Sequence, residues 1–418
     1  MAPLRFPAVR LRRPGLPHAA AMRRAERPFF VRRMVLVAPL FLFLLLNFLA
    51  PISLMLMRSV EDSELPSVWP QTAASLRKAD PSVLPDKQLA GTLLTELAKS
   101  YADGRLSEVA NRLNYDEAGF RTLLFRTAEH LGEIDRARLP ASLLGFDRRW
   151  REPETWAVMR HAAGPSTSFY LLAAVDRRLD TDDKIVRSPS ERAVFVQVLV
   201  RTFWISAVVA LLCLVLGYPL AYLLATLPEK YSNALMILVL LPFWTSTLVR
   251  TTAWIVLLQT HGAVNDFLLG AGVIGQPLAL IYNRVGVYVA MTHVLLPYFV
   301  LPLYAVMKGI SPVPLRAALS LGATPMRTFW SVYAPQTGPG IAAGGLLVFV
   351  LALGYYITPA LVGGPADQMI SYFIAFYTNQ SLNWGMAAAL GLVLLAATLL
   401  VMWLNGRIAG ERLSVWRA

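Results

Sequence analysis

Long apolar runs limit what this chain can fold into more than any other feature. A helix needs roughly 20 apolar residues to cross a bilayer, and several runs reach that length. The composition agrees, because 56% of the 418 residues are hydrophobic, a larger share than soluble domains usually have. We therefore predict an all-α polytopic membrane protein with six transmembrane helices. They are expected at 34–57, 208–227, 233–259, 287–307, 341–362 and 384–405.

Basic residues are concentrated beside these apolar runs. Residues 58–194 carry 20 Lys/Arg against 21 Asp/Glu, whereas the rest of the chain carries 19 against 5. Because basic residues collect on the cytoplasmic side of membrane helices, we expect both termini and the loops at 228–232 and 309–340 to be cytoplasmic. A nucleic-acid site would need a basic patch interleaved with stacking aromatics, and the sequence has none. We expect this chain to contact membrane lipid and no nucleic acid.

The same pattern divides the chain into five parts. They are a basic cytoplasmic tail (1–33), a first transmembrane helix (34–57), an extracytoplasmic, mostly helical insert (58–188), a core of five transmembrane helices (189–408) and a cytoplasmic tail (409–418). The insert is long enough to form a small helical domain, and it lies in the periplasm if the cell is Gram-negative.

Apolar residues of the insert recur at helical spacing. Leu89, Leu93, Leu94 and Leu97 fall on one helix face, and Asp103-Gly104 is expected to end that helix. A second helix is expected over 106–113.

A third helix of the insert is expected to be capped by Asp116. Four large aromatic side chains are expected to add to the core: Trp150, Trp156, Phe169 and Tyr170. The insert ends at Ser188-Pro189-Ser190-Glu191, a capping box with proline at the first helical position. It predicts a long helix from 189 to 227, kinked near Gly217-Tyr218-Pro219.

Residues 311–341 show a helix, elbow, helix pattern between two spans. Ser311-Pro312 is a start signal for a first helix, which is expected to stop at Gly322 because glycine tolerates a left-handed backbone. Thr324-Pro325 repeats the start signal, and the second helix is expected to end by Pro335. The pattern predicts a rigid unit that fits a partner. An ordinary connection between helices is the alternative.

Arg250 interrupts the third expected span. A charged residue at membrane depth is costly and usually faces an aqueous cavity or a partner. An arginine late in an outward-running helix can also extend its side chain to the outer interface. The sequence leaves both interpretations open. His293, alone in the fourth span, is expected to serve packing.

Several kinds of chemistry are missing from the sequence. It contains no P-loop pattern, no HExxH or GxSxG motif and no metal-spaced His/Asp cluster, so we expect no catalytic and no metal-binding residues. The single cysteine, Cys213, rules out an intrachain disulfide. Acidic residues are nearly absent from the spans, so there are too few carboxylates to form a proton or sodium relay for ion-coupled transport. Uphill transport would need energy from another subunit through a cytoplasmic contact.

The segment RAALSLGA at 316–323, followed by Pro325, Phe329 and Pro335, resembles the EAA motif of ABC importer permeases. Three other segments resemble the spermidine/putrescine branch of that family: LGYPLAY at 216–222, PFWTS at 242–246 with VRT at 249–251, and YITPALVGG at 356–364. The resemblance covers about 190–408 and the first span. It implies a type I ABC importer permease fold in a bacterial inner membrane.

The resemblance implies that residues 311–340 are the cytoplasmic coupling loop, which docks into a cleft on an ATPase. The residues implied in ATPase coupling are Arg316, Ala317, Ala318, Leu321, Gly322, Ala323, Pro325 and Phe329. Arg316 stands where the motif has glutamate, so the contact would rest on an acid of the partner or on shape. The implied partners are a dimer of ATPase subunits, which bind ATP and Mg²⁺, a second permease subunit and a periplasmic solute-binding protein. The chain itself is implied to hold no cofactor and no ATPase site.

For the solute, the branch implies a polyamine such as spermidine or putrescine, or a related small organic cation or amino-acid-like compound. Residues implied along the translocation path are Arg250, Trp244, Trp254, Tyr298 and Tyr355, the aromatic ones through cation–π contacts; helix packing is the alternative for the aromatic rings.

The insert is longer than expected between the first two spans of this branch. It is expected either to contact the binding protein or another partner, or to stabilise the assembly. The alternative for the whole chain is a non-transporting membrane receptor or assembly protein, with 58–188 as its sensing domain.

Overall fold

A computed structural model describes residues 37–79 and 84–415 of the chain. The chain consists of two compact units, Met1–Met55 and Leu56–Ala418. In the first unit the helix that begins at Val37 contains a π-helical segment, η1 (Leu45–Leu49), and continues as α2 (Ala50–Met57). The predicted first span is therefore confirmed over Val37–Met57. The basic tail (1–33) lies outside the described residues.

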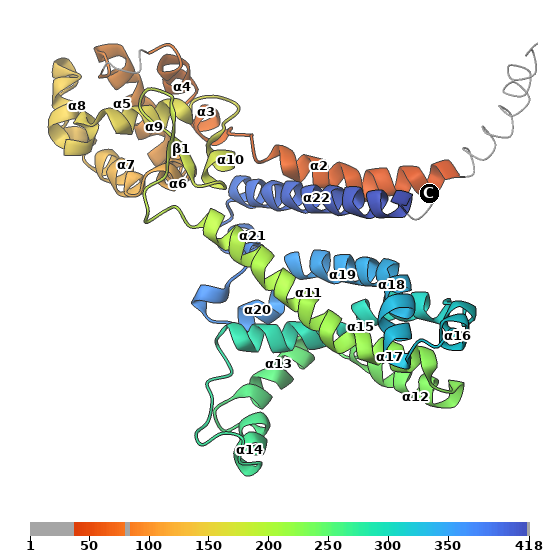
Figure 1. Ribbon diagram of the computed structural model, residues 1–418. Helices are drawn as coiled ribbons and strands as arrows, with labels where there is room; N and C mark the ends of the chain where they lie inside the picture. The colour runs from red at the N-terminus through yellow and green to blue at the C-terminus, as the bar shows by residue number, and fades with distance from the viewer. Residues whose placement is uncertain (1–36, 80–83, 416–418) are drawn as a thin grey trace, which may run out of the picture. The chain divides into compact units, whose positions relative to one another are not determined.

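The other membrane-spanning helices lie in the second unit. Among the described residues, four helices are long and apolar enough to cross a bilayer: Val37–Met57, α11 (Phe195–Thr226), α15 (Arg284–Lys308) and the Trp384–Arg407 part of α22 (Trp384–Val415). The number rises to six if two bent helix pairs each count as one span. At the centre, α11 packs against α15 and α19 (Gly338–Leu353), as Figure 1 shows. The predicted all-α membrane fold is confirmed.

The third expected span is broken. α12 (Glu229–Leu240) and the 3₁₀ turn η5 (Leu241–Trp244) are followed by α13 (Thr247–Leu258) and α14 (Ala263–Gly270), and the two halves are bent by 100°. Pro242 lies at the break, where it lacks an N–H for the helix ladder. Thr245 and Ser246 then adopt extended backbone. A single continuous helix over 233–259 is thus wrong.

The fifth expected span, 341–362, is also interrupted. α19 ends at Leu353, and the short α20 (Ile357–Val362) begins after Gly354-Tyr355-Tyr356. The 3₁₀ turn η7 (Pro365–Asp367) and α21 (Ile370–Asn379) lead from there to α22. Irregular backbone at membrane depth is tolerated where it is buried in protein or lines a cavity.

The start of α11 differs from the prediction. The helix begins at Phe195, because both carboxylate oxygens of Asp176 accept hydrogen bonds, from Phe195 N and Val196 N, each at 2.9 Å. The expected capping box forms a turn instead, with Pro189 O accepting from Arg192 N. The helix then continues through Pro219 to Thr226.

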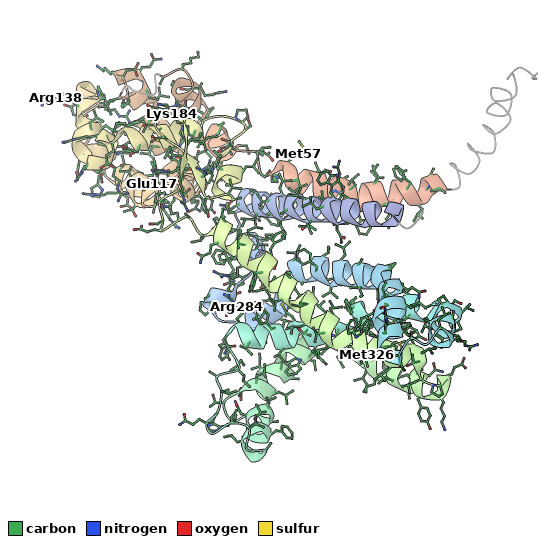
Figure 2. The ribbon with its side chains drawn as sticks, viewed as in Figure 1. Met57, Glu117, Arg138, Lys184, Arg284 and Met326 are labelled. Carbon is green, nitrogen blue, oxygen red and sulfur yellow. The ribbon has the colours of Figure 1, made fainter. Side chains whose placement is uncertain are left out.

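The insert folds around its own apolar core. Its helices and short turns are α3 (Glu64–Val68), α4 (Pro70–Leu76), α5 (Lys87–Ala102), α6 (Leu106–Asp116), α7 (Phe120–Glu129), η2 (Leu131–Glu133), η3 (Arg136–Arg138), α8 (Ala141–Phe146), η4 (Arg148–Arg151), α9 (Pro153–His161) and α10 (Phe169–Ala173). The predicted leucine face of α5 is buried, together with Trp150 and Trp156. Gly104, which ends α5, has φ +71°. Charged side chains such as Arg138 and Lys184 cover the outside (Figure 2).

Two expectations about the insert are wrong. Asp116 does not cap α7, because it ends α6 and forms an ion pair with Arg112 at 3.0 Å; Gly119 (φ +96°) precedes α7 instead. Phe169 and Tyr170 do not join the insert core. They lie in a second cluster with residues of α11, α21 and α22.

A short antiparallel ribbon follows α10. It pairs β1 (Arg177–Leu179) with β2 (Ile185–Arg187), and the sequence did not predict it.

A hydrogen bond connects the insert to the membrane core. The Tyr115 hydroxyl donates to Ser381 O at 3.1 Å. The insert is therefore fastened to the core near the start of α22.

Close packing of α19 on α15 gives a first testable prediction. A Cβ at Gly344 would lie 2.8 Å from the Phe299 carbonyl oxygen, whereas at Gly345 the nearest atom would be 4.0 Å away. Gly344→Ala is expected to destabilise the helix pair by about 1–3 kcal/mol through overpacking. Gly345→Ala is the matched control and should be neutral or stabilising, since alanine favours a helix over glycine. Thermal unfolding in detergent measures both, and equal midpoints would contradict the prediction.

Candidate coupling loop and translocation site

The segment between α15 and α19 forms two short helices joined by a glycine elbow. α16 (Val313–Ser320) follows Ser311, whose Oγ accepts from Val313 N at 3.3 Å. Gly322 has φ +87°, as predicted for a residue with left-handed backbone. The Thr324 side chain caps α17 (Pro325–Thr328) by accepting from Arg327 N at 3.4 Å. The predicted elbow is confirmed.

The second helix continues further than expected. After α17 the chain passes through the π-helix η6 (Phe329–Tyr333) into α18 (Ala334–Gln336), so Pro335 does not end it. Pro335 lies in the first turn of α18, where its missing N–H is tolerated. The bend comes at Thr337, and Pro325–Gln336 meets Gly338–Leu353 at 58°.

Aromatic side chains attach this unit to α11. The Phe329 ring packs edge-on against Tyr222 and stacks on Tyr333, each with ring centroids 5.7 Å apart. The neighbouring Trp330 is 66% exposed. The packed rings therefore connect η6 to α11.

The solvent-exposed face of the loop carries apolar and basic side chains. Leu321 is 89% exposed and Met326, labelled in Figure 2, is 68% exposed. Arg316 and Arg327 are exposed beside them, and no acid occurs anywhere from 309 to 366. Of the other predicted coupling residues, Ala317, Gly322 and Pro325 are exposed, whereas Ala318, Ala323 and Phe329 are partly buried.

A second group of polar side chains lies where α13 packs against α15 and α20. The Thr251 and Thr358 hydroxyl oxygens are 3.0 Å apart. Trp254 Nε1 donates to His293 Nδ1 at 3.2 Å. Arg250 Nη2 donates to Thr247 Oγ1 at 3.3 Å.

Tyr355 joins this polar cluster from the break between α19 and α20. Its side chain lies near those of Thr247, Thr358, Tyr298 and Arg250. Tyr298 also packs edge-on against Phe243, with centroids 4.9 Å apart. The structure therefore brings together four of the five predicted path residues.

Trp244 stands apart from the cluster, since it is 79% exposed. The sequence analysis did not select Thr247, Thr251, Thr358 or His293. A single threonine or histidine in an apolar span belongs to no motif that would mark it as functional. These residues come together because α13, α15 and α20 pack against one another.

Arg250 lacks a negative partner among the described residues. Its Nε and Nη1 are buried and make no hydrogen bond there. Arg284, by contrast, pairs with Asp367 at 2.9 Å. An arginine that extends to the membrane surface would expose its guanidinium, whereas these two nitrogens are shielded by protein.

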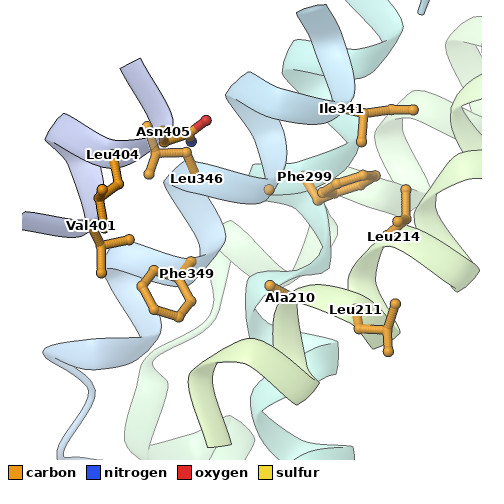
Figure 3. Close-up of a pocket in the computed structure, with 11 residues that line it drawn as sticks. Ala210, Leu211, Leu214, Phe299, Ile341, Leu346, Phe349, Val401, Leu404 and Asn405 are labelled. Atoms are coloured by element: carbon orange, nitrogen blue, oxygen red, sulfur yellow. The ribbon is translucent and has the colours of Figure 1, made fainter. Parts of the chain in front are cut away.

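A cavity of about 510 Å³ lies elsewhere, among α11, α15, α19 and α22. Figure 3 shows Val401 and Leu404 on one side of it and Leu211 and Leu214 on the other. Its lining is apolar apart from Asn405, so Asn405 is the single polar side chain among its lining residues that a charged solute could contact. The polar cluster around Arg250 is the better candidate for solute contact.

Comparison with known proteins decides the family. Residues 217–411 match the model of the family described as binding-protein-dependent transport system inner membrane component. The spermidine/putrescine transport system permease protein PotB of Salmonella typhimurium (strain LT2) is 35% identical over 223 residues, which are 53% of this chain and 78% of that protein. The chain belongs to this family of ABC importer permeases.

PotB of Escherichia coli (strain K12) is 34% identical to this permease over 224 residues, 53% of this chain and 82% of that protein. The crystal structure of a bacterial alginate ABC transporter, in complex with an alginate pentasaccharide-bound periplasmic protein, contains a chain with 19% identity and a TM-score of 0.44. That likeness covers 51% of this chain and 78% of the other. The resemblance stated from the sequence motifs is confirmed, and the permease is a multi-pass inner-membrane protein.

Proposed function

We propose that this permease is driven by a separate ATPase subunit that docks on residues 311–340. The supporting observation is the loop itself: two short helices, each preceded by a hydroxyl that accepts a backbone hydrogen bond, an elbow at Gly322 and an exposed apolar face around Leu321. A rigid unit can transmit a small displacement, and the Phe329 rings connect it to α11. ATP and Mg²⁺ would be held by the partner, and the side chains of this chain would act only in coupling.

The same proposal sets the topology. Both termini and the coupling loop lie in the cytoplasm, and residues 58–188 lie outside, in the periplasm. A second permease subunit completes the path, and a periplasmic solute-binding protein delivers the solute. The insert either receives that protein or stabilises the assembly.

For the solute we propose a small amine-bearing compound. The names of the PotB relatives point to polyamines such as spermidine and putrescine. Related small organic cations and amino-acid-like compounds belong to the same range of sizes and share the amine.

Affinity purification tests the coupling proposal. The permease is tagged, extracted in mild detergent and purified, and a P-loop ATPase subunit is expected to come with it. A variant that lacks 312–334 should lose the ATPase and ATP-dependent uptake together. Absence of any ATPase from the wild-type preparation, with uptake unaffected by the deletion, would refute the proposal and favour a receptor or assembly role.

A further inference from the structure

We propose that the cavity among α11, α15, α19 and α22 binds an anionic phospholipid, with one acyl chain in the cavity and the phosphate at the basic end of α22. The inference goes beyond the proposed importer function and draws on its topology only to name the leaflet. It follows from the lining, the volume and the depth of the cavity, and from the basic residues at one end of it.

Hydrocarbon lines almost the whole cavity. Ten of its eleven lining residues are apolar, and the eleventh is Asn405. Small residues leave the space open: Ala210 carries a single methyl group, and a Cβ at Gly345 would meet its nearest atom, Cε2 of Phe299, only at 4.0 Å. A charged solute would lose its hydration here without hydrogen bonds in return, whereas an acyl chain gains apolar contact.

The volume of the cavity is too small for a helix. A transmembrane helix about 10 Å wide and 30 Å long occupies roughly 2,400 Å³. The cavity holds about 510 Å³, so a further membrane span, from this chain or another subunit, can place side chains in it but not its backbone. A cavity of this size lies within the range of small-ligand pockets, about 300–1,000 Å³.

The lining residues lie at a depth that an acyl chain reaches. With the loop at 309–340 in the cytoplasm, as proposed, α19 begins at the inner membrane surface. From Ile341 to Phe349 the helix rises about 12 Å, against about 15 Å for the hydrocarbon of one leaflet. Asn405 lies near the end of the last span, Trp384–Arg407, and Figure 3 shows it on the same side of the cavity as Leu404. The cavity therefore extends from the cytoplasmic surface into the inner leaflet.

Basic residues stand where the phosphate of such a lipid would lie. The Arg407 guanidinium lies over the Trp403 ring, 4.4 Å from its centroid, and both side chains are exposed. Tryptophan and arginine at the end of a span are typical of the membrane interface. From 405 to 418 the sequence holds three arginines and one glutamate. Basic residues beside the membrane attract anionic headgroups, and the Asn405 amide adds hydrogen-bond donors.

Photo-cross-linking tests the site. The permease complex, purified from its native membrane, is placed in phosphatidylcholine nanodiscs with a small share of phosphatidylglycerol that bears a diazirine on one acyl chain. Mass spectrometry then identifies the labelled peptides. Labelling is expected at the lining segments 210–214, 341–349 and 401–405, and it should saturate as the share of the probe rises. The exposed apolar face of α11 at Val200 and Trp204 is the control, where labelling should rise in proportion to the probe.

Two pairs of variants locate the chain and the phosphate. Ala210→Leu is expected to lower labelling of the lining segments about 10-fold, because its added carbons displace methylene groups of the lipid. Ala343→Leu makes the same change at an exposed position of α19 outside the lining and should leave labelling unchanged. Arg407→Gln is expected to weaken labelling about 5-fold, the effect of one basic residue near an anionic surface. Arg407→Lys keeps the charge and should retain it.

A phosphatidylcholine probe with the same diazirine chain tests the headgroup. It is expected to label the lining segments less than the phosphatidylglycerol probe does, and Arg407→Gln should not change its labelling. Size-exclusion profiles and thermal midpoints show whether each variant complex remains assembled.

Three outcomes would overturn the inference. They are labelling of the lining segments that rises in proportion to the probe, as on the control face; equal labelling in Ala210→Leu and the wild type; and equal labelling by the two probes. The first would mean that the cavity meets only bulk lipid. Failure of the proposed importer function is distinguishable, because it is measured by the absence of a co-purifying ATPase and not by lipid labelling.

Discussion

Replacing Leu321 with aspartate is expected to lower ATP-dependent uptake by roughly 30-fold or more. A docking residue at the centre of an interface contributes about 2–4 kcal/mol, and a carboxylate placed in an apolar cleft also pays for its desolvation. Leu321 presents its side chain outward, at 89% exposure, from a loop whose elbow fixes its position. Uptake in reconstituted vesicles and the amount of ATPase retained during purification measure the effect.

Leu321→Asp is expected to leave the stability of the fold unchanged, so that a loss of uptake can be assigned to docking. Because the side chain is already exposed, its replacement removes almost no buried area, and the thermal midpoint of the permease should not move beyond the usual range for surface changes. Ile185→Asp makes the same kind of change at a 62% exposed position of the insert and should leave uptake intact. Unchanged uptake and ATPase retention in Leu321→Asp would remove this loop from the docking surface.

The second large effect is expected in the insert, where Arg112 forms a buried ion pair with Asp62 at 2.6 Å. The two side chains are 1% and 0% exposed, and the guanidinium also bonds Asp116 at 3.0 Å. Arg112→Met leaves these carboxylates without their counter-charge, which is expected to destabilise the insert by about 3–5 kcal/mol. The rate of tryptic cleavage within residues 86–160 of the full-length protein reports this loss.

The destabilisation should depend on pH. Burial raises the pKa of Asp62 to about 6 from its ordinary 3.8, against the opposing charge of Arg112. Without Arg112 the folded-state pKa rises further, so the folded variant holds its proton to a higher pH than the unfolded chain does. The protonated Asp62 therefore contributes to the free energy of unfolding at low pH, and this contribution is lost as the pH rises through the folded-state pKa of Asp62. The deficit of the variant relative to wild type should therefore grow between pH 6 and pH 8.

Two comparison variants make the Arg112 prediction specific. Asp62→Asn combined with Arg112→Met removes one uncompensated charge and should recover part of the stability and weaken the pH dependence. Arg105→Met breaks an exposed pair with Glu108 and should cost no more than about 1 kcal/mol. A double variant as unstable as Arg112→Met, with the same pH dependence, would show that the ion pair is not the cause.

The sequence alone determined the features that depend on residues close to one another in the chain. Apolar length predicted where the membrane-spanning segments lie, helical spacing placed Leu93 and Leu97 on a buried face, and Gly322 with Thr324 set the elbow of the proposed coupling loop. Each of these follows from local backbone preference or periodicity, which any short window of sequence contains.

Only the tertiary structure decided the rest, because its causes are contacts between distant residues. Asp176 starts α11 from 19 residues away, a partner that no capping pattern at 188–191 reveals. The breaks in the third and fifth spans leave backbone groups without helical hydrogen bonds, and other helices must bury them. Beside these breaks α13 packs against α15 and α20. In the described part of the chain, that packing buries two nitrogens of Arg250 without a hydrogen-bond partner. The sequence left the place of Arg250 open, because burial depends on what the rest of the chain packs around a residue.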